Sequence, residues 1–259
     1  MLEITPLQAF EDNYIWMLTE VSASRSIAVD PGDETPVLEW LQGRGATLAG
    51  VLITHHHYDH IGGLPELLAV FPGIPVYGPA KHRILGVNRL VAERERINIP
   101  GMAVEFGVLD LPGHTAGHVA YQAEGALFCG DTLFAAGCGR VFDGTFEQLS
   151  ASLRRIAALP PETLIYCAHE YTLANLGFAA WVEPDSEPLR ERTREEQAKR
   201  ARGEPTVPSR LALELATNPF LRTGEPSVIQ AAERYAGHPL ADHCAVFTAL
   251  RTWKDREYD

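Results

Sequence analysis

The chain has 259 residues, 46% of them hydrophobic and 22% charged, and its 22 basic and 34 acidic side chains give a formal net charge of −12. A chain of this length and composition can bury a large core without disulfide bonds, and its acidic balance argues against a nucleic-acid partner. The four cysteines have no CxxC spacing, which excludes a zinc ribbon or thioredoxin-type motif and fits free thiols in a reducing compartment.

The sequence indicates neither a signal peptide nor a membrane span. The first residues contain no basic segment followed by an apolar core, and no apolar run approaches the roughly 18 residues that a spanning helix needs. We therefore expect a cytoplasmic protein.

The first two-thirds of the chain alternates short apolar runs with turn residues, which predicts an α/β core. The run at 26–30 ends in Pro31-Gly32 and predicts a strand followed by a turn. A helix is predicted at 35–44, with Thr35 as N-cap and Pro36 at the first helical position. Further strands are predicted at 48–54, 76–77, 104–111, 119–123, 126–129 and 163–168, and further helices at 61–71 and 146–159.

The composition changes after about residue 174. Residues 184–202 are dense in charges of both signs and predict an exposed helix, with Ser186 as its N-cap. Helices are also predicted at 210–215, 227–236 and 240–253. The sequence therefore predicts an α/β domain over 1–173 and a small all-helical domain over 174–259.

Four histidines fall within six positions, in the run His55-His56-His57-Tyr58-Asp59-His60, directly after a predicted strand. In an extended segment alternate side chains share a face, so His55 and His57 can point at one ion. Asp59 and His60 lie one step further along and can reach a second. Imidazole and carboxylate groups are the ligands that zinc, iron and manganese use.

Three more candidate ligands, His114, Asp131 and His169, each follow a predicted strand. Strand ends on one rim of a sheet converge, so positions distant in the sequence can form one cluster. Together with His55, His57, Asp59 and His60 they make five histidines and two aspartates. That set provides three terminal ligands for each of two metal ions and one shared carboxylate.

Other interpretations of these residues are weaker. A surface metal-scavenging tract usually lies in a tail, whereas this run lies between a buried strand and an apolar helix. By alternation His56 points away from the ligands, and His118 is expected to support a ligand rather than bind metal. The sequence has no GxSxG, P-loop or HExxH motif, and Gly137-Cys138-Gly139 lacks the GxGxxG context of a phosphate site.

The segment 54–60 resembles the THxHxDH signature of the metallo-β-lactamase superfamily, and His114, Asp131 and His169 follow in the order that this superfamily has. Four further stretches resemble the glyoxalase II (hydroxyacylglutathione hydrolase) family within it, and with them the resemblance covers essentially the whole chain. They are Phe10–Trp16 (FxDNYxW), Gly130–Arg140 (GDTLFxxGCGR/K), Cys167–Asn175 (CxHEYTxxN), and Asn218–Arg222 with Arg251–Asp255 of the family's helical C-terminal domain.

The resemblance implies a four-layer αββα sandwich followed by a small all-α domain, and it implies a ligand set. One metal takes His55, His57 and His114, the other takes Asp59, His60 and His169, and Asp131 bridges them. Two divalent ions are implied, zinc first, with iron or manganese as alternatives.

The resemblance also implies the reaction and the substrate contacts. The expected activity is hydrolysis of S-D-lactoylglutathione to D-lactate and glutathione, a step of methylglyoxal detoxification, by a metal-bridging hydroxide that Asp59 and Asp131 orient. Glutathione contacts carry over to Arg140, Tyr171, Arg251 and Lys254. Many members have a tyrosine where this chain has Phe142, so one hydroxyl contact to glutathione is missing.

Four other functions remain as alternatives. A mononuclear-iron glutathione persulfide dioxygenase fits less well, because the second-metal ligands and the helical C-terminal domain are both present. The basic pair Arg251 and Lys254 argues against a lactonase or β-lactamase. A nucleic-acid-processing member would have a basic face, and a non-catalytic metal or interaction protein would usually have lost ligands. The sequence carries no direct signal of the oligomeric state, and a monomer is expected.

Overall fold

The computed structural model describes residues 2–20 and 24–258, and the chain forms two compact units. Unit 1 comprises Met1–Asp110 and Gly117–Gly130, and unit 2 comprises Leu111–Ala116 and Asp131–Asp259. The boundary predicted after residue 173 concerns a different division, between a catalytic and a helical region, and it stays a prediction.

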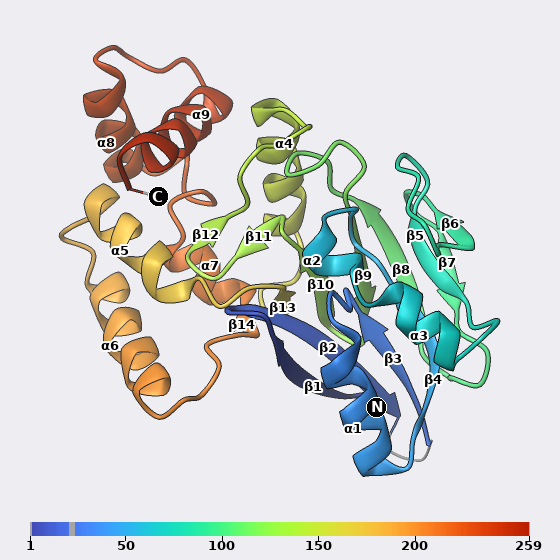
Figure 1. Ribbon diagram of the computed structural model, residues 1–259. Helices are drawn as coiled ribbons and strands as arrows, with labels where there is room; N and C mark the ends of the chain where they lie inside the picture. The colour runs from blue at the N-terminus through green and yellow to red at the C-terminus, as the bar shows by residue number, and fades with distance from the viewer. Residues whose placement is uncertain (1, 21–23, 259) are drawn as a thin grey trace. The chain divides into compact units, whose positions relative to one another are not determined.

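The first sheet of unit 1 follows the order β1-β2-β3-β4-β5-β6. Strands β1, β2 and β3 pair antiparallel, and β3 to β6 pair parallel (Figure 1). The sequence analysis did not predict β1, β2 or β6; β2 is buried almost throughout and therefore lacks the alternation that marks a half-buried strand. The strands are β1 (Leu2–Ala9), β2 (Asn13–Glu20), β3 (Arg25–Val29), β4 (Thr47–Leu52), β5 (Val76–Pro79) and β6 (Arg89–Val91).

Three helices accompany this sheet, α1 (Glu34–Arg44), α2 (Tyr58–Ile61) and α3 (Leu64–Val70). The predicted cap of the first helix was wrong: the carboxylate of Asp33 accepts from the Thr35 N–H at 2.8 Å, so the helix begins at Glu34. The single helix predicted at 61–71 is interrupted, because α2 ends before Gly62-Gly63 and α3 follows.

The apolar faces of α1 and α3 form a core with the first sheet. Val37 and Leu41 of α1, and Leu64 and Leu67 of α3, belong to one buried cluster with strand residues such as Val51. Burying such side chains stabilises the fold by roughly 1.5–3 kcal/mol each. This core fixes the carboxyl ends of β3 and β4, from which the segments toward α1 and α2 leave.

The second group of strands in unit 1 is an antiparallel meander: β7 (Arg96–Asn98), β8 (Glu105–Asp110), β9 (Val119–Ala123) and β10 (Ala126–Gly130). The Tyr121 hydroxyl on β9 donates to the carbonyl of Ile53 at 2.8 Å, and the Val119 N–H donates to the carbonyl of Thr54 at 2.9 Å. These two bonds attach the start of β9 to the segment that carries the histidine run.

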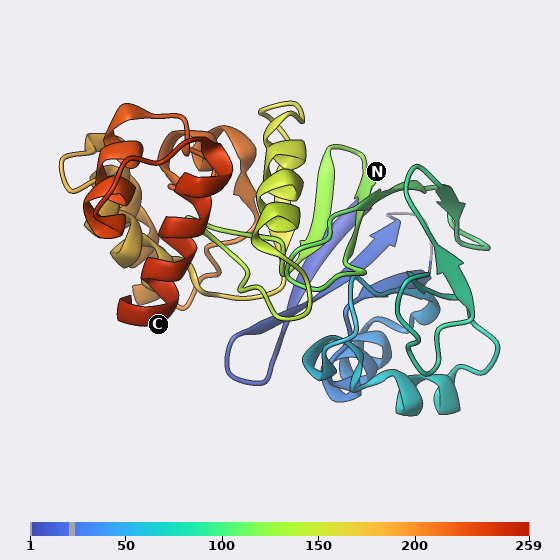
Figure 2. The same cartoon turned by 90° about the horizontal axis from the view of Figure 1, so that it is seen from above.

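Unit 2 is mainly helical, and Figures 1 and 2 show its C-terminal helices in yellow to red, with α8 beside α9 in both views. Ser186 caps α6 as predicted, by accepting from the Leu189 N–H at 3.4 Å. The helix α5 was not predicted as a separate element. The elements are α4 (Phe146–Ala157), β13 (Leu164–Cys167), α5 (Thr172–Val182), α6 (Glu187–Ala201), β14 (Ser209–Arg210), α7 (Leu211–Thr217), α8 (Pro226–Ala236), α9 (His243–Trp253) and a π-helical turn (Lys254–Tyr258).

A short hairpin at the start of unit 2 was also missed by the sequence analysis. Strands β11 (Leu133–Phe134) and β12 (Gly137–Cys138) pair antiparallel around a turn at Ala135-Ala136. Ala136 has a left-handed φ of 57°, and each strand has only two residues. The hairpin therefore makes few hydrogen bonds of its own, and its backbone depends on partners from elsewhere in unit 2.

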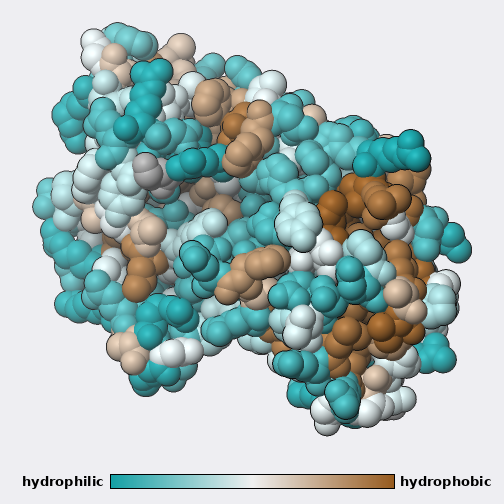
Figure 3. Space-filling view, in the orientation of Figure 1, coloured by the Kyte–Doolittle hydropathy of each residue, from teal (hydrophilic) through white to brown (hydrophobic). Residues whose placement is uncertain are grey.

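Most of the face shown in Figure 3 is hydrophilic, in keeping with the net charge of −12. A hydrophobic area lies over the region of α3, β5 and β6, where Val70, Leu85 and Leu90 are exposed. Among the described residues, no helix is both long enough and apolar enough to cross a membrane.

Candidate metal centre

The histidine run leaves β4 and places two pairs of candidate ligands together in unit 1. His55 Nε2 lies 3.1 Å from His57 Nδ1, and His60 Nε2 lies 3.4 Å from Asp59 Oδ2. The His55 and His60 rings are 4.0 Å apart between centroids and both are fully buried. The structure therefore brings together the four predicted ligands of this segment, one pair for each predicted metal.

Asp30, at the end of β3, holds two of these histidines and was not singled out from the sequence. Its carboxylate accepts from the Thr54 N–H and the Thr54 hydroxyl, both at 2.7 Å, and lies 3.1 Å from His60 Nδ1. The Thr54 hydroxyl gives its proton to Asp30, so it must accept from His55 Nδ1, 3.0 Å away. His55 therefore carries its ring proton on Nδ1 and presents the Nε2 lone pair.

Asn13 supports the aspartate of the run. Its side-chain amide donates to Asp59 Oδ2 at 3.0 Å, and Asn13 itself is buried. This position lies in the FxDNYxW stretch, so the sequence marked it without giving its role. The amide orients the Asp59 carboxylate, whose side chain keeps 38% exposure.

Unit 2 brings its three predicted ligands together around one carboxylate oxygen. Asp131 Oδ2 lies 3.5 Å from His114 Nε2 and 3.4 Å from His169 Nε2. His114 Nδ1 donates to the carbonyl of Arg140 at 2.8 Å, so this ring also presents its Nε2 lone pair. A side chain at Gly139 would collide with the Asp131 carbonyl and His114 Nδ1, which requires glycine there. Asp131 thus lies between one predicted ligand of each metal.

The donor sets of both units suit divalent metal ions. The ligand atoms are carboxylate oxygens and imidazole nitrogens, mostly buried, and the Nδ1 hydrogen bonds of His55 and His114 assign the Nε2 lone pairs of these two rings. Hydrogen-bonded second partners such as Asp30 and the Arg140 carbonyl are what metal-binding histidines use to fix their orientation. The fit does not select zinc over iron or manganese.

Tyr171 follows His169 closely, and both rings pack against the hairpin. The His169 and Tyr171 rings stack with centroids 4.7 Å apart at 6°. Phe134 of β11 meets both rings edge-on, at 5.7 Å from His169 and 5.3 Å from Tyr171. Tyr171 is 36% exposed, so it remains accessible from solvent.

The three basic residues predicted to bind glutathione differ in their exposure and in the contacts that they already make within the protein. Arg251 is buried, donates to the Cys138 carbonyl at 3.1 Å and pairs with Asp255 at 2.8 Å. Arg140 keeps 52% side-chain exposure, with its Nε 3.6 Å from Asp255. Lys254 lies in the turn after α9, with Nζ 5.7 Å from the Tyr258 ring centroid. Asp255, which lies beside both arginines, was not predicted as a site residue.

The residues expected to lie outside the ligand set have other contacts. His118 stacks on His55 at 4.8 Å between ring centroids, and His56 meets His82 edge-on at 4.3 Å. Phe142 is 65% exposed and its ring lies 5.2 Å from that of His114. The side chain at this position lies beside a predicted ligand and presents no hydroxyl.

The cysteines take no visible part in the chemistry. All four are free, and three are buried. Burial raises the pKa of the Cys138 thiol to about 11 and that of the Cys167 thiol to about 12. Both stay protonated at neutral pH, so neither is a thiolate nucleophile or a thiolate ligand.

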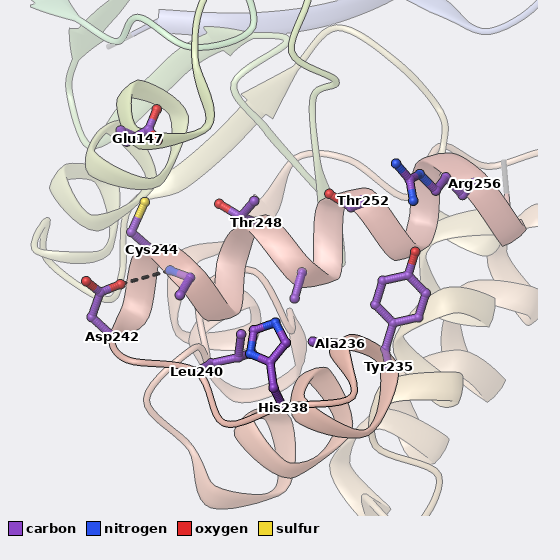
Figure 4. A pocket seen from close by; sticks show the side chains of 12 residues that line it. Glu147, Tyr235, Ala236, His238, Leu240, Asp242, Cys244, Thr248, Thr252 and Arg256 are labelled. Carbon is purple, nitrogen blue, oxygen red and sulfur yellow. Dashed lines mark hydrogen bonds between the residues drawn. The ribbon is translucent and has the colours of Figure 1, made fainter.

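A separate groove of about 730 Å³ lies in unit 2 between α4, α8 and α9 (Figure 4). Glu147, Asp242 and Cys244 lie toward one end, and Tyr235 and Arg256 toward the other. Within the described part of the chain, its lining includes none of the residues predicted to bind metal or glutathione.

Comparison with known sequences finds two matching family models. The metallo-β-lactamase superfamily model matches residues 18–169, and the model described as "Hydroxyacylglutathione hydrolase C-terminus" matches residues 170–257. A hydroxyacylglutathione hydrolase of Alkalilimnicola ehrlichii is 55% identical over 256 residues, which cover 99% of this chain and 100% of that relative.

Solved structures show the same fold at lower identity. The BLEG-1 B3 metallo-β-lactamase has a TM-score of 0.63 and 24% identity, covering 85% of this chain and 99% of that one. TTHA1623, solved in a di-iron-bound form, has a TM-score of 0.59 and 25% identity, covering 85% and 100%. The predicted fold class is confirmed: a metallo-β-lactamase fold with mixed sheets flanked by helices, followed by a helical C-terminal region.

Proposed function

The chain belongs to the hydroxyacylglutathione hydrolase family of the metallo-β-lactamase superfamily, and we propose that it hydrolyses glutathione thioesters, S-D-lactoylglutathione first among them. The observation that carries the proposal is the arrangement of Asp131 between His114 and His169, together with the ordered histidine run of unit 1. These are the ligands that the family resemblance requires.

The proposed centre would hold two divalent ions, one at His55, His57 and His114 and the other at Asp59, His60 and His169, with Asp131 serving both. The assignment is supported by the ligand pairs within each unit and by the di-iron-bound form of the neighbour TTHA1623. Zinc is our first choice of metal, with iron or manganese as alternatives. Such ions supply Lewis-acid polarisation of a carbonyl and a water molecule of lowered pKa.

The protein's own residues position the reactants. The carboxylates of Asp59 and Asp131 accept hydrogen bonds from the attacking water and orient it toward the thioester carbonyl carbon. The C–S bond then breaks and the sulfur leaves as glutathione thiolate, which needs little help from an acid. The reaction therefore needs no serine or cysteine nucleophile, in keeping with the protonated thiols of Cys138 and Cys167.

Glutathione carries two carboxylates, and the basic residues near the hairpin are proposed to bind one of them. Arg140, Arg251 and Lys254 are proposed to make this contact; Arg251 also donates to Cys138 and Asp255, and Lys254 is buried like Arg251. Tyr171, stacked on His169, donates its hydroxyl to a substrate amide. The missing hydroxyl at Phe142 is expected to weaken substrate affinity.

We also propose a location and a class of partner for the protein. The four free cysteines support a reducing, cytoplasmic compartment. The net charge of −12 supports a small-molecule substrate rather than a nucleic acid. A monomer is our working assumption for the experiments below.

The test is thioester cleavage by purified, metal-loaded protein, followed as release of free thiol from S-D-lactoylglutathione with and without chelator. Chelator-sensitive turnover with kcat/KM within about 10⁴–10⁸ M⁻¹s⁻¹ is expected. No turnover from metal-loaded protein would overturn the proposal. Oxygen uptake with glutathione persulfide would instead identify a dioxygenase.

A further inference from the structure

A buried ion pair in unit 2 has no role in the reaction described above. Arg192 of α6 is 1% exposed and Glu214 of α7 is 0% exposed, and they pair at 2.5 Å. Taking two charges out of water is costly, and a buried pair rarely stabilises a fold more than apolar side chains of the same size would. The surroundings of this pair therefore need an explanation other than stability.

Glu214 is surrounded by hydrogen-bond donors. Its Oε1 accepts from Arg192 and Ser209, and its Oε2 accepts from the Ala136 N–H at 2.8 Å and from Asn218 Nδ2 at 3.1 Å. Arg192 thus lies on one side of the Glu214 carboxylate, and the turn of the β11–β12 hairpin lies on the other. All four partners are donors, which suits a side chain that accepts at both of its oxygens.

Other side chains hold the same hairpin through its carbonyl groups. Asn218, the residue after α7, has its Nδ2 3.2 Å from the Phe134 carbonyl and 2.9 Å from the Gly137 carbonyl, so its two N–H groups are shared among these carbonyls and Glu214 Oε2. Asn175 of α5 donates to Ala135 at 3.0 Å, and Arg251 of α9 donates to Cys138 at 3.1 Å. Backbone groups from Phe134 through Cys138 are therefore bound by side chains of α5, α7 and α9.

The hairpin joins residues of the proposed site. Asp131 lies two residues before β11, and Arg140 lies two residues after β12. Phe134 packs edge-on against His169 and Tyr171. A displaced hairpin would shift the shared carboxylate, the exposed arginine and the rings beside the second metal together.

We propose that Glu214, held in place by Arg192, is a positioning residue that sets the β11–β12 hairpin and through it Asp131 and the stacked His169–Tyr171 pair. The helical C-terminal region then has two tasks, binding glutathione and fixing part of the metal centre. This inference rests on the proposed function for the roles of Asp131, His169 and Tyr171.

The decisive variant is Glu214→Gln, which keeps the size of the side chain. Its amide NH₂ must point at two of the four donors, whichever way it turns. The matched control is Glu196→Gln, on another buried glutamate, whose ion-pair partner is Lys199 of the same helix at 2.9 Å and which has no bond to the hairpin among the described contacts.

The first readout is hydrogen–deuterium exchange of metal-free protein, followed by mass spectrometry. Glu214→Gln is expected to speed exchange in the peptide over 131–140, with the peptide over 50–60 unchanged, while Glu196→Gln alters neither. Equal exchange at 131–140 in Glu214→Gln and wild type, or the same change in both variants, would overturn the inference. This readout does not depend on thioester activity.

The second readout is steady-state kinetics of metal-loaded protein. A displaced hairpin is expected to lower kcat/KM by about 10–100-fold, the range found when partners that orient metal ligands are removed, with both kcat and KM affected. If metal-loaded wild type is inactive, the proposed function is wrong, but the exchange experiment still tests whether Glu214 positions the hairpin. If Glu214→Gln is insoluble, Asn218→Ala is the alternative variant, because it keeps the Arg192–Glu214 ion pair and removes two hydrogen bonds to the hairpin. It is expected to speed exchange in the same peptide, 131–140.

Discussion

The histidine run of unit 1 and the hairpin of unit 2 both hold proposed metal ligands, but they are fixed in different ways. In unit 1 the supporting groups lie at strand ends: Asp30 after β3 and Thr54 after β4 orient His55 and His60. In unit 2 the support for the segment of Asp131 comes from Glu214, Asn218 and other helical residues far along the chain. One half is thus fixed locally, and the other by long-range contacts.

This difference has consequences for mutation. Damage to the run should stay within a few neighbouring residues, whereas damage to the helical region should reach the metal centre and the substrate contacts together.

The largest effect is expected at the shared ligand. Asp131→Ala removes the carboxylate that lies between His114 and His169, so turnover should fall by more than the roughly 10–100-fold seen for partners outside the ligand set. The measurement is kcat/KM for S-D-lactoylglutathione. Asp143→Ala, an exposed aspartate of the same unit, is the control and should retain activity. An active Asp131→Ala protein would remove Asp131 from the ligand set.

The next effect tests the local support in unit 1. Asp30→Asn places an amide NH₂ among the two Thr54 donors and His60 Nδ1, so the Thr54 hydroxyl no longer fixes the His55 tautomer. Metal affinity should fall by about 10–100-fold, measured by competition with a chelator. Asp33→Asn, at the cap of α1, is the control and should change stability only slightly. Equal metal affinity in Asp30→Asn and wild type would contradict the orienting role.

A smaller effect is expected from Arg140, which is half-exposed, and from Lys254, which is buried. Arg140→Ala and Lys254→Ala should each raise KM by about 10-fold with little change in kcat, because each removes a charge-assisted contact to a substrate carboxylate. Arg256→Ala, in the same turn as Lys254, is the matched control. Unchanged KM in both variants would show that glutathione binds elsewhere. Arg251→Ala should lower kcat as well, since Arg251 also holds the hairpin.

The smallest effect separates general stability of the helical region from hairpin support. Burial raises the pKa of the Glu183 carboxyl, but hydrogen bonds from Arg222 and Ser227 outweigh it and hold that pKa below its ordinary value. Because the folded-state pKa is lowered, the ionised carboxyl stabilises the fold at pH values above the ordinary pKa of glutamate. That stabilisation is lost as the pH falls through the folded-state pKa. The Tm advantage of metal-free wild type over Glu183→Gln should therefore be present at pH 7 and shrink below about pH 4.5. A Tm advantage of wild type that grew on acidification would contradict the lowered pKa of Glu183. The kcat of Glu183→Gln at pH 7 should equal that of wild type.

The local half of the centre could be predicted from the sequence because its signals are contiguous. The histidine run follows an apolar strand, and alternation along an extended segment was enough to place His55 beside His57. The cap of α6 at Ser186 was likewise predicted from neighbouring residues. The cap of α1 was missed because Asp33, not Thr35, supplies the acceptor, two positions earlier.

The long-range half could not be derived in the same way. A hairpin of two-residue strands has no periodicity, and Glu214 looks like an ordinary surface residue in a short amphipathic helix. Its burial depends on Arg192 and Asn218, which only the folded chain brings to it. Arg251 was predicted as a substrate residue by resemblance, yet its contacts with Cys138 and Asp255 appear only in the structure.

The central claim is that both halves serve one two-metal hydrolytic centre, and bound metal per chain tests it most directly. Elemental analysis of wild type and Asp131→Ala after removal of free metal would be set beside thioester turnover of the same samples. We predict two metal ions in each active wild-type chain, and joint loss of metal and activity in Asp131→Ala. Full turnover with one metal per chain, or two metals retained by Asp131→Ala, would contradict the account.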